Sequence, residues 1–259
     1  MTANPEEPPV TDYSQLDDHR LAAKLAVDAG THLRKLRENE TQSLDWAPWE
    51  LGDQGDMAAH HFLMDQLAEA RPSDAVLSEE GADDRARLTA ERIWIVDPLD
   101  GSYDYSSGHS PDYAVHIGLV SSGRPLVGAV SIPETKEVFA TDDTFPEDPN
   151  RVKPVVIASR AQARSGVAIA ETLGGSALIA GSAGVKAMAV VRGDADVYVH
   201  PSGLYEWDAC APAAVAAAAG LDVFNLDGEP LEYNKDYPII RGLIISRPRF
   251  TQPVLDLFR

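Results

Sequence analysis

Residues 94–105 read WIVDPLDGSYDY, an apolar run that ends in two carboxylates, a glycine and a hydroxyl. The apolar residues suit a buried strand, and Gly101 permits a tight turn directly after it. Such a turn would direct Asp97 and Asp100 toward one point, where their charges repel each other unless a cation lies between them. Oxygen ligands of this kind suit Mg²⁺ or Mn²⁺. From the motif alone, a solvated Asp-Pro turn is the alternative.

Composition limits the possible partners. The chain has 259 residues, of which 44% are hydrophobic, and this is enough for one large domain or two smaller ones. Its formal net charge of −19 disfavours binding to a nucleic-acid polymer or to an anionic membrane surface. A small anionic ligand is compatible with this charge if bound metal ions reverse the local field. We therefore expect a small-molecule partner.

Three features indicate the cellular compartment. Cys210 is the only cysteine, so the chain forms no internal disulfide, and a reducing cytoplasm fits best. The first 18 residues are acidic and proline-rich, unlike a signal peptide. The longest apolar run, residues 211–221, contains Pro212 and is too short to cross a bilayer. We expect a cytoplasmic protein without a membrane span.

Hydrophobic periodicity changes along the chain. In the first part we expect helices at 18–37 and 56–70, a loop at 41–56, and strands at 75–78, 92–96, 113–121, 125–132 and 137–141. The acidic, proline-bearing segment 142–154 marks a domain boundary. Beyond it, strands at 155–158, 176–179, 195–200 and 242–246 alternate with helices at 165–173, 183–192, 208–219 and 252–258. This alternation is typical of a sheet packed between helices.

Two other junctions also carry carboxylates. Glu79 and Glu80, in LSEEG, follow a short apolar strand, and Asp208, in EWDACAPAAVAAAAG, lies at a predicted helix start. Asp208 could serve simply as the N-cap of that helix, with Pro212 in its first turn. Each residue alone has a local explanation. Together with the strand end at Asp97, however, they place carboxylates where open α/β sheets hold their ligands.

The spacing of these motifs carries a family resemblance. LSEEG, then WIVDPLDGS with Asp97 eighteen residues after Glu79, then EWDACAPAAVAAAAG resembles the inositol monophosphatase superfamily of metal-dependent, lithium-sensitive phosphatases. The resemblance extends over residues 21–246. Within the superfamily, AVLSEE, AVHIGL, GSAGVKAMAV and LDGEPLEYN look closest to the CysQ-type 3′(2′),5′-bisphosphate nucleotidases.

The resemblance implies an α/β fold, a layered αβαβα sandwich of the inositol monophosphatase and fructose-1,6-bisphosphatase type. We predict an amino-terminal α+β domain over residues 1–145, with an antiparallel sheet and most of the metal ligands. Residues 152–259 would form an α/β domain that carries Asp208 and the substrate contacts.

The resemblance also implies a ligand set for two or three Mg²⁺ ions, for which Mn²⁺ can substitute. The implied ligands are the side chains of Glu79, Asp97, Asp100 and Asp208 and the carbonyl oxygen of Leu99. Asp97 is also assigned a catalytic role, and Asp56 falls where the family has the aspartate that activates the attacking water together with a hydroxyl. Ser102 supplies that hydroxyl where the family usually has threonine, so the group is kept but the β-branch that restricts its rotamer is lost.

Substrate contacts are implied around two further motifs. In GSAGVKAMAV, Lys186 resembles a contact to the second phosphate of a bisphosphate nucleotide, whereas an ordinary surface lysine is the alternative. Glu206 matches a position that often binds a substrate hydroxyl, although an exposed loop glutamate would look the same. The complete implied set of substrate-binding residues is Asp100, Gly101, Ser102, Gly181, Ser182, Lys186, Glu206 and Asp208. Tyr103 and SRAQ, at 159–162, depart from the branch's usual pattern and leave the exact substrate open.

Other polar residues have structural interpretations. His116 lies in a predicted strand and is interpreted as a core residue with satisfied hydrogen bonds. His109, in the loop after the aspartate motif, is a weaker candidate for the lining of the active site. Cys210 is interpreted as a small buried hydrophobe, since no activating base is evident.

The implied reaction is Mg²⁺-dependent hydrolysis of the 3′-phosphate of adenosine 3′,5′-bisphosphate (PAP) to AMP, with the sulfated nucleotide PAPS, which would give APS, as a further substrate. The alternatives are an inositol monophosphatase or fructose-1,6-bisphosphatase, or a biosynthetic phosphatase for an unusual nucleotide or sugar phosphate. A catalytically silent binding protein would be expected to lack some of the ligands, and here every acidic position is present. A homodimer is also open.

Overall fold

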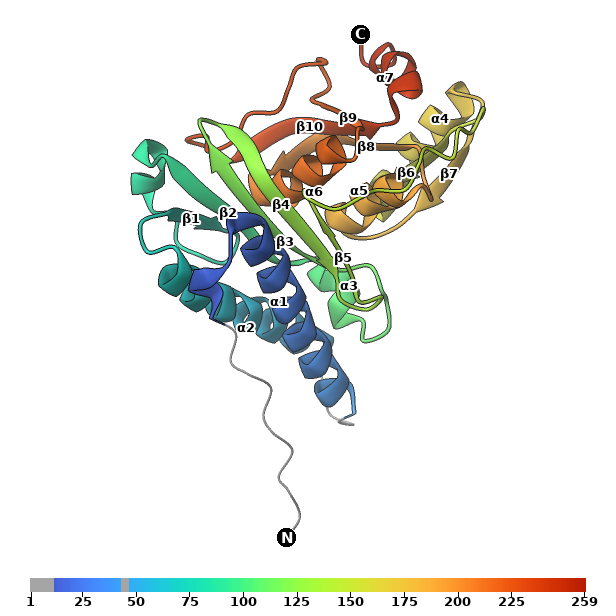
Figure 1. Cartoon of the computed structure of the whole chain (residues 1–259). Coiled ribbons are helices and arrows are strands. Elements are labelled where there is room, and N and C mark those ends of the chain that lie inside the picture. The colour runs from blue at the N-terminus through green and yellow to red at the C-terminus, as the bar shows by residue number, and fades with distance from the viewer. Residues whose placement is uncertain (1–11, 43–46) are drawn as a thin grey trace.

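The structure is a computed structural model that describes residues 12–42 and 47–259. Within these residues the chain forms two five-stranded sheets, with helices between the sheets and on their outer faces (Figure 1). Helix and sheet layers therefore alternate, and the predicted αβαβα sandwich is confirmed.

The first sheet is built from the amino-terminal half of the chain, in the strand order β1-β2-β3-β4-β5. β1 runs parallel to β2, and the other neighbours are antiparallel. Helices α1 and α2 cover one face of this sheet (Figure 1). The elements of this half are η1 (Tyr13–Gln15), α1 (Asp18–Thr41), α2 (Pro48–Ala70), β1 (Ala75–Ser78), η2 (Arg85–Thr89), β2 (Arg92–Asp100), α3 (Ser102–Ser106), β3 (Ala114–Ser121), β4 (Arg124–Ile132) and β5 (Glu137–Ala140).

The second sheet has the strand order β7-β6-β8-β10-β9. β6 is parallel to both β7 and β8, whereas β10 is antiparallel to β8 and β9. Helices α4 and α7 contribute to the apolar cluster on its outer face. The elements of this half are β6 (Val155–Ala158), η3 (Arg160–Gln162), α4 (Ala163–Thr172), β7 (Ser176–Ile179), α5 (Ala183–Arg192), β8 (Val197–Tyr205), α6 (Glu206–Ala218), β9 (Asp222–Phe224), β10 (Ile239–Ser246) and α7 (Pro248–Leu255).

Helices α5 and α6 form the layer between the two sheets (Figure 1). The alanine-rich helix α6 approaches the first sheet closely because glycines face it. A Cβ on Gly118 would lie 2.7 Å from Cys210 Sγ, and one on Gly128 would lie 2.7 Å from Ala214 Cβ. Side chains at these two positions would push the helix away. The glycines thus set the position of α6, and of Asp208 in its first turn, relative to the first sheet.

Helix α2 begins earlier than its sequence pattern predicts. The expected loop at 41–56 is wrong for residues 48–55, which are helical, while residues 43–46 lie outside the described residues. Pro48 stands in the first turn, where a missing N–H costs nothing. Leu51, Gly52 and Gly55 are buried, so tertiary packing offsets the low helix propensity of the glycines.

Other boundaries also shift. Strand β2 continues to Asp100, β8 continues to Tyr205, and α6 starts directly after it at Glu206. The last helix is Pro248–Leu255 instead of 252–258, since Pro248 begins it. The β8–α6 and β10–α7 junctions contain no glycine and almost no loop, so the local sequence gives little signal for them.

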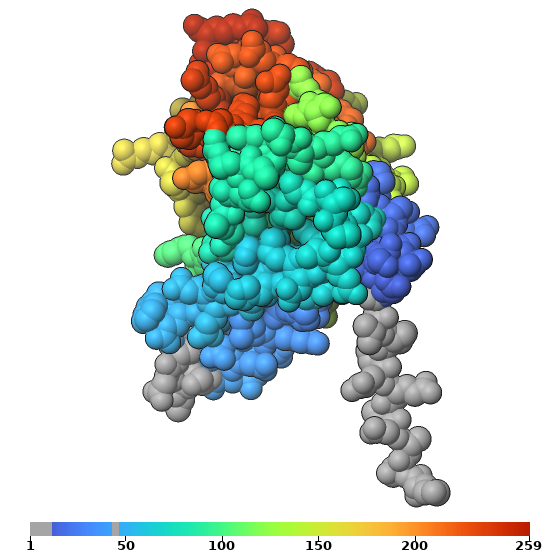
Figure 2. All heavy atoms as spheres, turned by 90° about the vertical axis from the view of Figure 1, so that its left-hand side faces the viewer, coloured from blue at the N-terminus to red at the C-terminus, as the bar shows by residue number. Residues whose placement is uncertain are grey.

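The chain passes from the first sheet to the second within residues 141–154, where the boundary was predicted. The blue-to-green half and the orange-to-red half lie directly against each other (Figure 2). One apolar cluster joins Ile95 of β2 with Tyr198 of β8. The two halves thus share part of their core, and the division into separate domains at 1–145 and 152–259 stays a prediction. Among the described residues, no helix is long and apolar enough to cross a membrane.

Candidate active site

Asp97 and Asp100 lie on the same side of β2 because the strand is irregular between them. Asp97 pairs with His116 and Asp100 with Ala114, so one extra residue is inserted on β2. Alternation would otherwise turn two residues three positions apart to opposite faces. The Leu99 amide donates to Asp97 Oδ1 at 3.1 Å, which holds the bulge.

Gly101 ends this strand with φ of 94°, in the left-handed region, and a Cβ there would lie only 2.6 Å from the Asp112 carbonyl oxygen. Glycine is therefore required for the turn that leads into α3. Ser102 is the first residue of α3 and Tyr103, next to it, is exposed.

Asp208 comes from the other half of the chain. It is the third residue of α6, and its Oδ2 accepts a hydrogen bond from the Tyr205 amide at 2.8 Å. The predicted N-cap role is therefore wrong, since Asp208 instead reaches back to the residue before the helix, as in a capping box. Its other oxygen remains available to the site. Asp97, Asp100 and Asp208, which we call the acidic cluster, offer ligand atoms that all lie within 4.8 Å of one another.

The electrostatics of the acidic cluster fit a bound cation. Asp97 is fully buried and its Oδ2 has no hydrogen-bond partner. Burial, followed by the charges of Asp100 and Glu79, raises the pKa of Asp97 well above its ordinary value. Burial and Asp100 raise the pKa of Asp208 to about 7. Carboxylates this close must be neutralised by protons or by cations, and an all-oxygen donor set suits a hard divalent ion.

Asp100 differs from its neighbours. Its burial would raise its pKa, but His116, Lys186 and the Ser182 hydroxyl more than offset this and bring the value to about 2. Its Oδ2 accepts hydrogen bonds from the Ser182 hydroxyl and from the Gly184 amide, the latter at 2.7 Å. Asp100 is therefore held as a carboxylate in a fixed orientation.

Glu79 lies just beyond β1, where its amide donates to the Val96 carbonyl at 3.2 Å and so places it beside β2. The residue is exposed, yet partial loss of solvent around its carboxyl, with the charges of Glu80 and Asp100, raises its pKa. Leu99 lies between the two aspartates of β2. Ligation by Glu79 and by the Leu99 carbonyl stays a prediction.

Asp56 lies in the third turn of α2, half-buried, and not at the start of the helix as expected. Burial, then the charges of Glu80, Glu79 and Asp53, raises its pKa to about 8. Asp56 thus faces the turn after β1. Gly52, one turn earlier, packs against the Ser102 carbonyl, where a Cβ would be 3.8 Å away. The two predicted water-activating residues therefore come from adjoining helices.

The loop before α5 binds the acidic cluster through Asp100. Ser182 has φ of 48°, and its hydroxyl and the Gly184 amide both bind Asp100. The Gly181 amide donates to Asp112 Oδ2 at 2.8 Å. The Gly184 amide is therefore already satisfied by Asp100 and is not free to bind a substrate.

Lys186 is 3% exposed and is not a surface lysine. Its Nζ donates to the Gly181 carbonyl at 3.1 Å and to the Ser182 carbonyl, and lies 5.4 Å from the centre of the Tyr198 ring. Burial lowers its pKa. Lys186 therefore holds the loop that positions Asp100, and its contact with a second phosphate stays a prediction.

Glu206 is fully buried and accepts hydrogen bonds from the amides of Asn234, at 2.6 Å, and Lys235, at 3.0 Å. The alternative of an exposed loop glutamate is therefore wrong. Its carboxylate anchors the segment before β10, and a contact with a substrate hydroxyl stays a prediction.

Two residues of the site were missed. His116 is buried, with Nε2 3.2 Å from Asp100 Oδ2 and Nδ1 3.1 Å from the Trp207 carbonyl oxygen, so the interpretation as an ordinary core residue is incomplete. The sequence feature that could have identified His116 as a site residue is a single imidazole in an otherwise apolar strand. Arg160 donates to Asp104 at 2.7 Å and to Asp112 at 2.8 Å, and thereby braces the Gly181 loop. His109 is exposed and Cys210 is buried and free.

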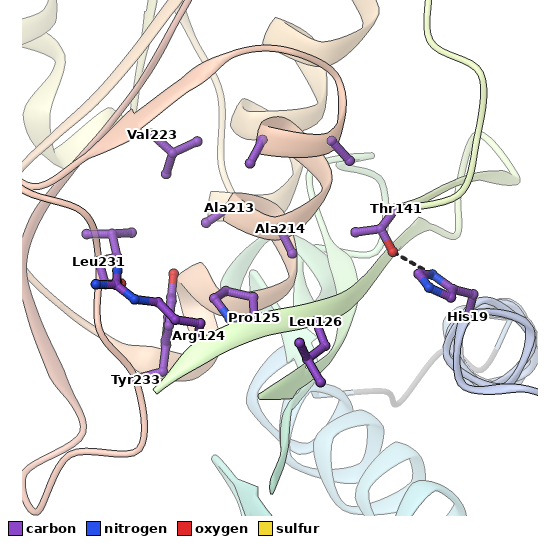
Figure 3. A pocket seen from close by; sticks show the side chains of 12 residues that line it. His19, Arg124, Pro125, Leu126, Thr141, Ala213, Ala214, Val223, Leu231 and Tyr233 are labelled. Carbon is purple, nitrogen blue, oxygen red and sulfur yellow. Dashed lines mark hydrogen bonds between the residues drawn. The ribbon is translucent and has the colours of Figure 1, made fainter. Parts of the chain in front are cut away.

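A pocket that is separate from this site lies at the carboxyl-terminal part of α6 (Figure 3). Ala213, Ala214, Pro125 and Leu231 line it, and the ring of His19 binds the Thr141 hydroxyl at 2.8 Å on one side. It contains none of the acidic cluster, so it is distinct from the candidate active site.

An αβαβα sandwich that gathers carboxylates at a junction between its two halves is suited to metal-dependent hydrolysis of phosphate esters. The chain belongs to the inositol monophosphatase family, whose model matches residues 17–255. Members of this family are metal-dependent phosphatases, and the predicted enzyme class is confirmed at that level.

Individual relatives agree with this assignment. The chain is 40% identical, over 96% of its length and 96% of the relative, to a protein of Mycobacterium leprae named 3′-phosphoadenosine 5′-phosphate phosphatase. It is 31% identical, over 69% of its length and 77% of the relative, to the Escherichia coli 3′(2′),5′-bisphosphate nucleotidase CysQ. Among solved structures, CysQ from Bacteroides thetaiotaomicron matches with a TM-score of 0.72 and 27% identity over 87% of this chain and 95% of that one.

Proposed function

We propose that this chain is a Mg²⁺-dependent phosphatase that removes the 3′-phosphate of PAP to give AMP, and that PAPS is a further substrate. The observation that carries the proposal is the acidic cluster, whose ligand atoms lie within 4.8 Å of one another. The choice of substrate is supported by the 40% identity with the relative named for that activity.

Glu79, Asp97, Asp100, Asp208 and the Leu99 carbonyl would hold the Mg²⁺ ions. When bound, divalent cations supply Lewis acidity and positive charge to the phosphate ester and to the attacking water. The chain's own contribution begins with Asp100, which stays ionised and fixed by Ser182 and Gly184. Because Asp100 need not lose a proton or change its rotamer, the free-energy cost of reorganising the site when a cation binds is smaller.

Asp56 is proposed to accept the proton of the attacking water, with the Ser102 hydroxyl orienting that water. Its pKa of about 8 before any cation binds, raised by burial and Glu80, makes it a better base near neutral pH than an ordinary aspartate. Ser102 stands at the first position of α3, directly after the turn at Gly101. The water would lie between α2 and α3.

The substrate would border Asp100, Gly101, Ser102, Asp208 and the Gly181–Ser182 loop. The Lys186 ammonium group donates to two carbonyl oxygens, so its third N–H would bind the 5′-phosphate, a contact that its charge favours. Glu206 would have to share an oxygen with a substrate hydroxyl while it keeps an amide of the 234–235 segment.

A substrate panel tests the proposal. Phosphate release is measured with PAP, PAPS, inositol 1-phosphate and fructose 1,6-bisphosphate, each with Mg²⁺ and with EDTA. We expect the highest kcat/KM for PAP and no turnover in EDTA. A tenfold higher kcat/KM for inositol phosphate than for PAP would overturn the choice of substrate. The cytoplasmic location and a homodimer are retained as proposals, and light scattering of the purified chain tests the dimer.

A further inference from the structure

An exposed aromatic stack adjoins the acidic cluster. The rings of Tyr205 and Trp207 lie parallel, with centroids 4.5 Å apart and 6° between their planes. Trp207 packs against the central apolar core, so it is the inner ring, whereas Tyr205 is 48% exposed. Ile239 pairs with Tyr205 across the β8–β10 ladder and is 45% exposed. We call Tyr205, Trp207 and Ile239 the aromatic platform.

The aromatic platform is tied to the site by the backbone. The Tyr205 amide donates to Asp208 Oδ2 at 2.8 Å, and the Trp207 carbonyl lies 3.1 Å from His116 Nδ1. The residue between them, Glu206, points the other way and is fully buried. The exposed Tyr205 ring therefore belongs to the residue whose backbone amide binds a proposed metal ligand.

The backbone contact with Asp208 does not require an aromatic side chain at position 205. The residue before α6 makes its contact with Asp208 through its backbone amide, which any residue except proline could supply. A ring backed by a second ring offers a flat, rigid surface for another flat group, and every nucleobase has a π-face that stacks on such a surface.

We propose that the aromatic platform binds the base of the nucleotide substrate, with the purine stacked on the outer face of Tyr205 while the 3′-phosphate lies at the acidic cluster. The inference rests on the proposed phosphatase function and adds the group that separates a nucleotide from a sugar or inositol phosphate. Ile239 closes one edge of the base site. Stacking on the face of the Tyr205 ring depends on the π-face that every base has, so the platform recognises an aromatic ring rather than adenine specifically.

Three variants test the proposal, each with PAP and with a base-free analogue, 1-deoxyribose 3,5-bisphosphate. Tyr205→Ala should lower kcat/KM for PAP by about 5- to 100-fold, the range for loss of one base stacked on an aromatic ring. Hydrolysis of the base-free analogue should stay within about twofold of wild type. Tyr205→Phe keeps the ring and should behave as wild type on both. Leu126→Ala removes an apolar side chain of similar exposure, 52%, in the pocket that lies away from the site, and serves as the matched control.

The same variants are compared for inhibition by AMP, which should weaken only in Tyr205→Ala. An equal loss of kcat/KM on both substrates would overturn the platform, because it would mean general damage to α6. If wild type prefers PAP to the base-free analogue and Tyr205→Ala keeps that preference, the platform is wrong while the proposed function stands. If wild type itself prefers inositol phosphate to PAP, the choice of a nucleotide and the platform both fail.

Discussion

Replacing Asp97 with asparagine should separate the chemistry of the acidic cluster from its effect on stability. Asp97 is fully buried, and its Oδ2 has no partner. Burial and the charges of Asp100 and Glu79 raise its pKa, so ionising this carboxyl in the metal-free protein is costly. Asparagine has nearly the same shape without the charge. Asp97→Asn should therefore fold and, in EDTA, should melt at or above the temperature of the wild type.

With Mg²⁺ the order should reverse. A ligand at 100 times its Kd stabilises the folded state by about 2.7 kcal/mol, and for a chain of this size each kcal/mol raises Tm by roughly 2–4 °C. The wild type should therefore gain roughly 5–10 °C, and the variant should gain little. Its kcat should fall by about 10²- to 10³-fold, as when a preorganised electrostatic group is removed from an active site.

Differential scanning fluorimetry over an Mg²⁺ titration, with phosphate release on the same samples, measures both effects. Asp53→Asn is the matched control, since Asp53 is an exposed acid of α2 near the site without a proposed ligand role. If Asp97→Asn keeps more than about a tenth of the wild-type kcat at saturating Mg²⁺, or the full Tm gain, the metal assignment is wrong.

Four other expectations follow from the site. Ser102→Ala should lower kcat more than Mg²⁺ affinity, and equal losses by kinetics and calorimetry would contradict its role in orienting water. His116→Ala should raise the Kd for Mg²⁺ by about 10- to 100-fold, because it removes a partner of Asp100; an unchanged isotherm would refute this. Lys186→Ala should weaken binding of Mg²⁺ as well as of PAP, since the lysine holds the loop on Asp100; a loss confined to PAP would contradict the loop role. Burial and nearby carboxylates raise the pKa of Asp56 to about 8 and of Asp208 to about 7, so between about pH 4 and pH 8 these two groups bind more protons in the folded metal-free chain than in the unfolded one. Urea unfolding in EDTA should therefore show stability falling from about pH 4 to pH 8, with a flatter profile in Mg²⁺.

The sequence alone was sufficient for the class of fold and the chemistry of the site. Strand and helix periodicities are patterns among residues close in sequence, and so is the glycine that permits the turn at position 101. Both can therefore be recognised without the tertiary structure. The ligand residue types are local as well: two aspartates three positions apart at a strand end are compatible with a cation site or with a solvated turn, and the carboxylates at Glu79 and Asp208 favour the cation. The motif spacing then led to the family, which the match over residues 17–255 confirms.

Tertiary structure decided how the side chains are used. The helical start of α2 depends on burial of its glycines, and the position of α6 depends on Gly118 and Gly128, which lie far away in sequence. The roles of Lys186 and Glu206 depend on which backbone groups reach them across the fold. Sequence patterns report whether a side chain is polar or apolar, but the energy of a buried charge depends on the partners that surround it in space. For this reason the sequence predicts only a core residue at His116, whereas its contact with Asp100 is defined by the tertiary structure.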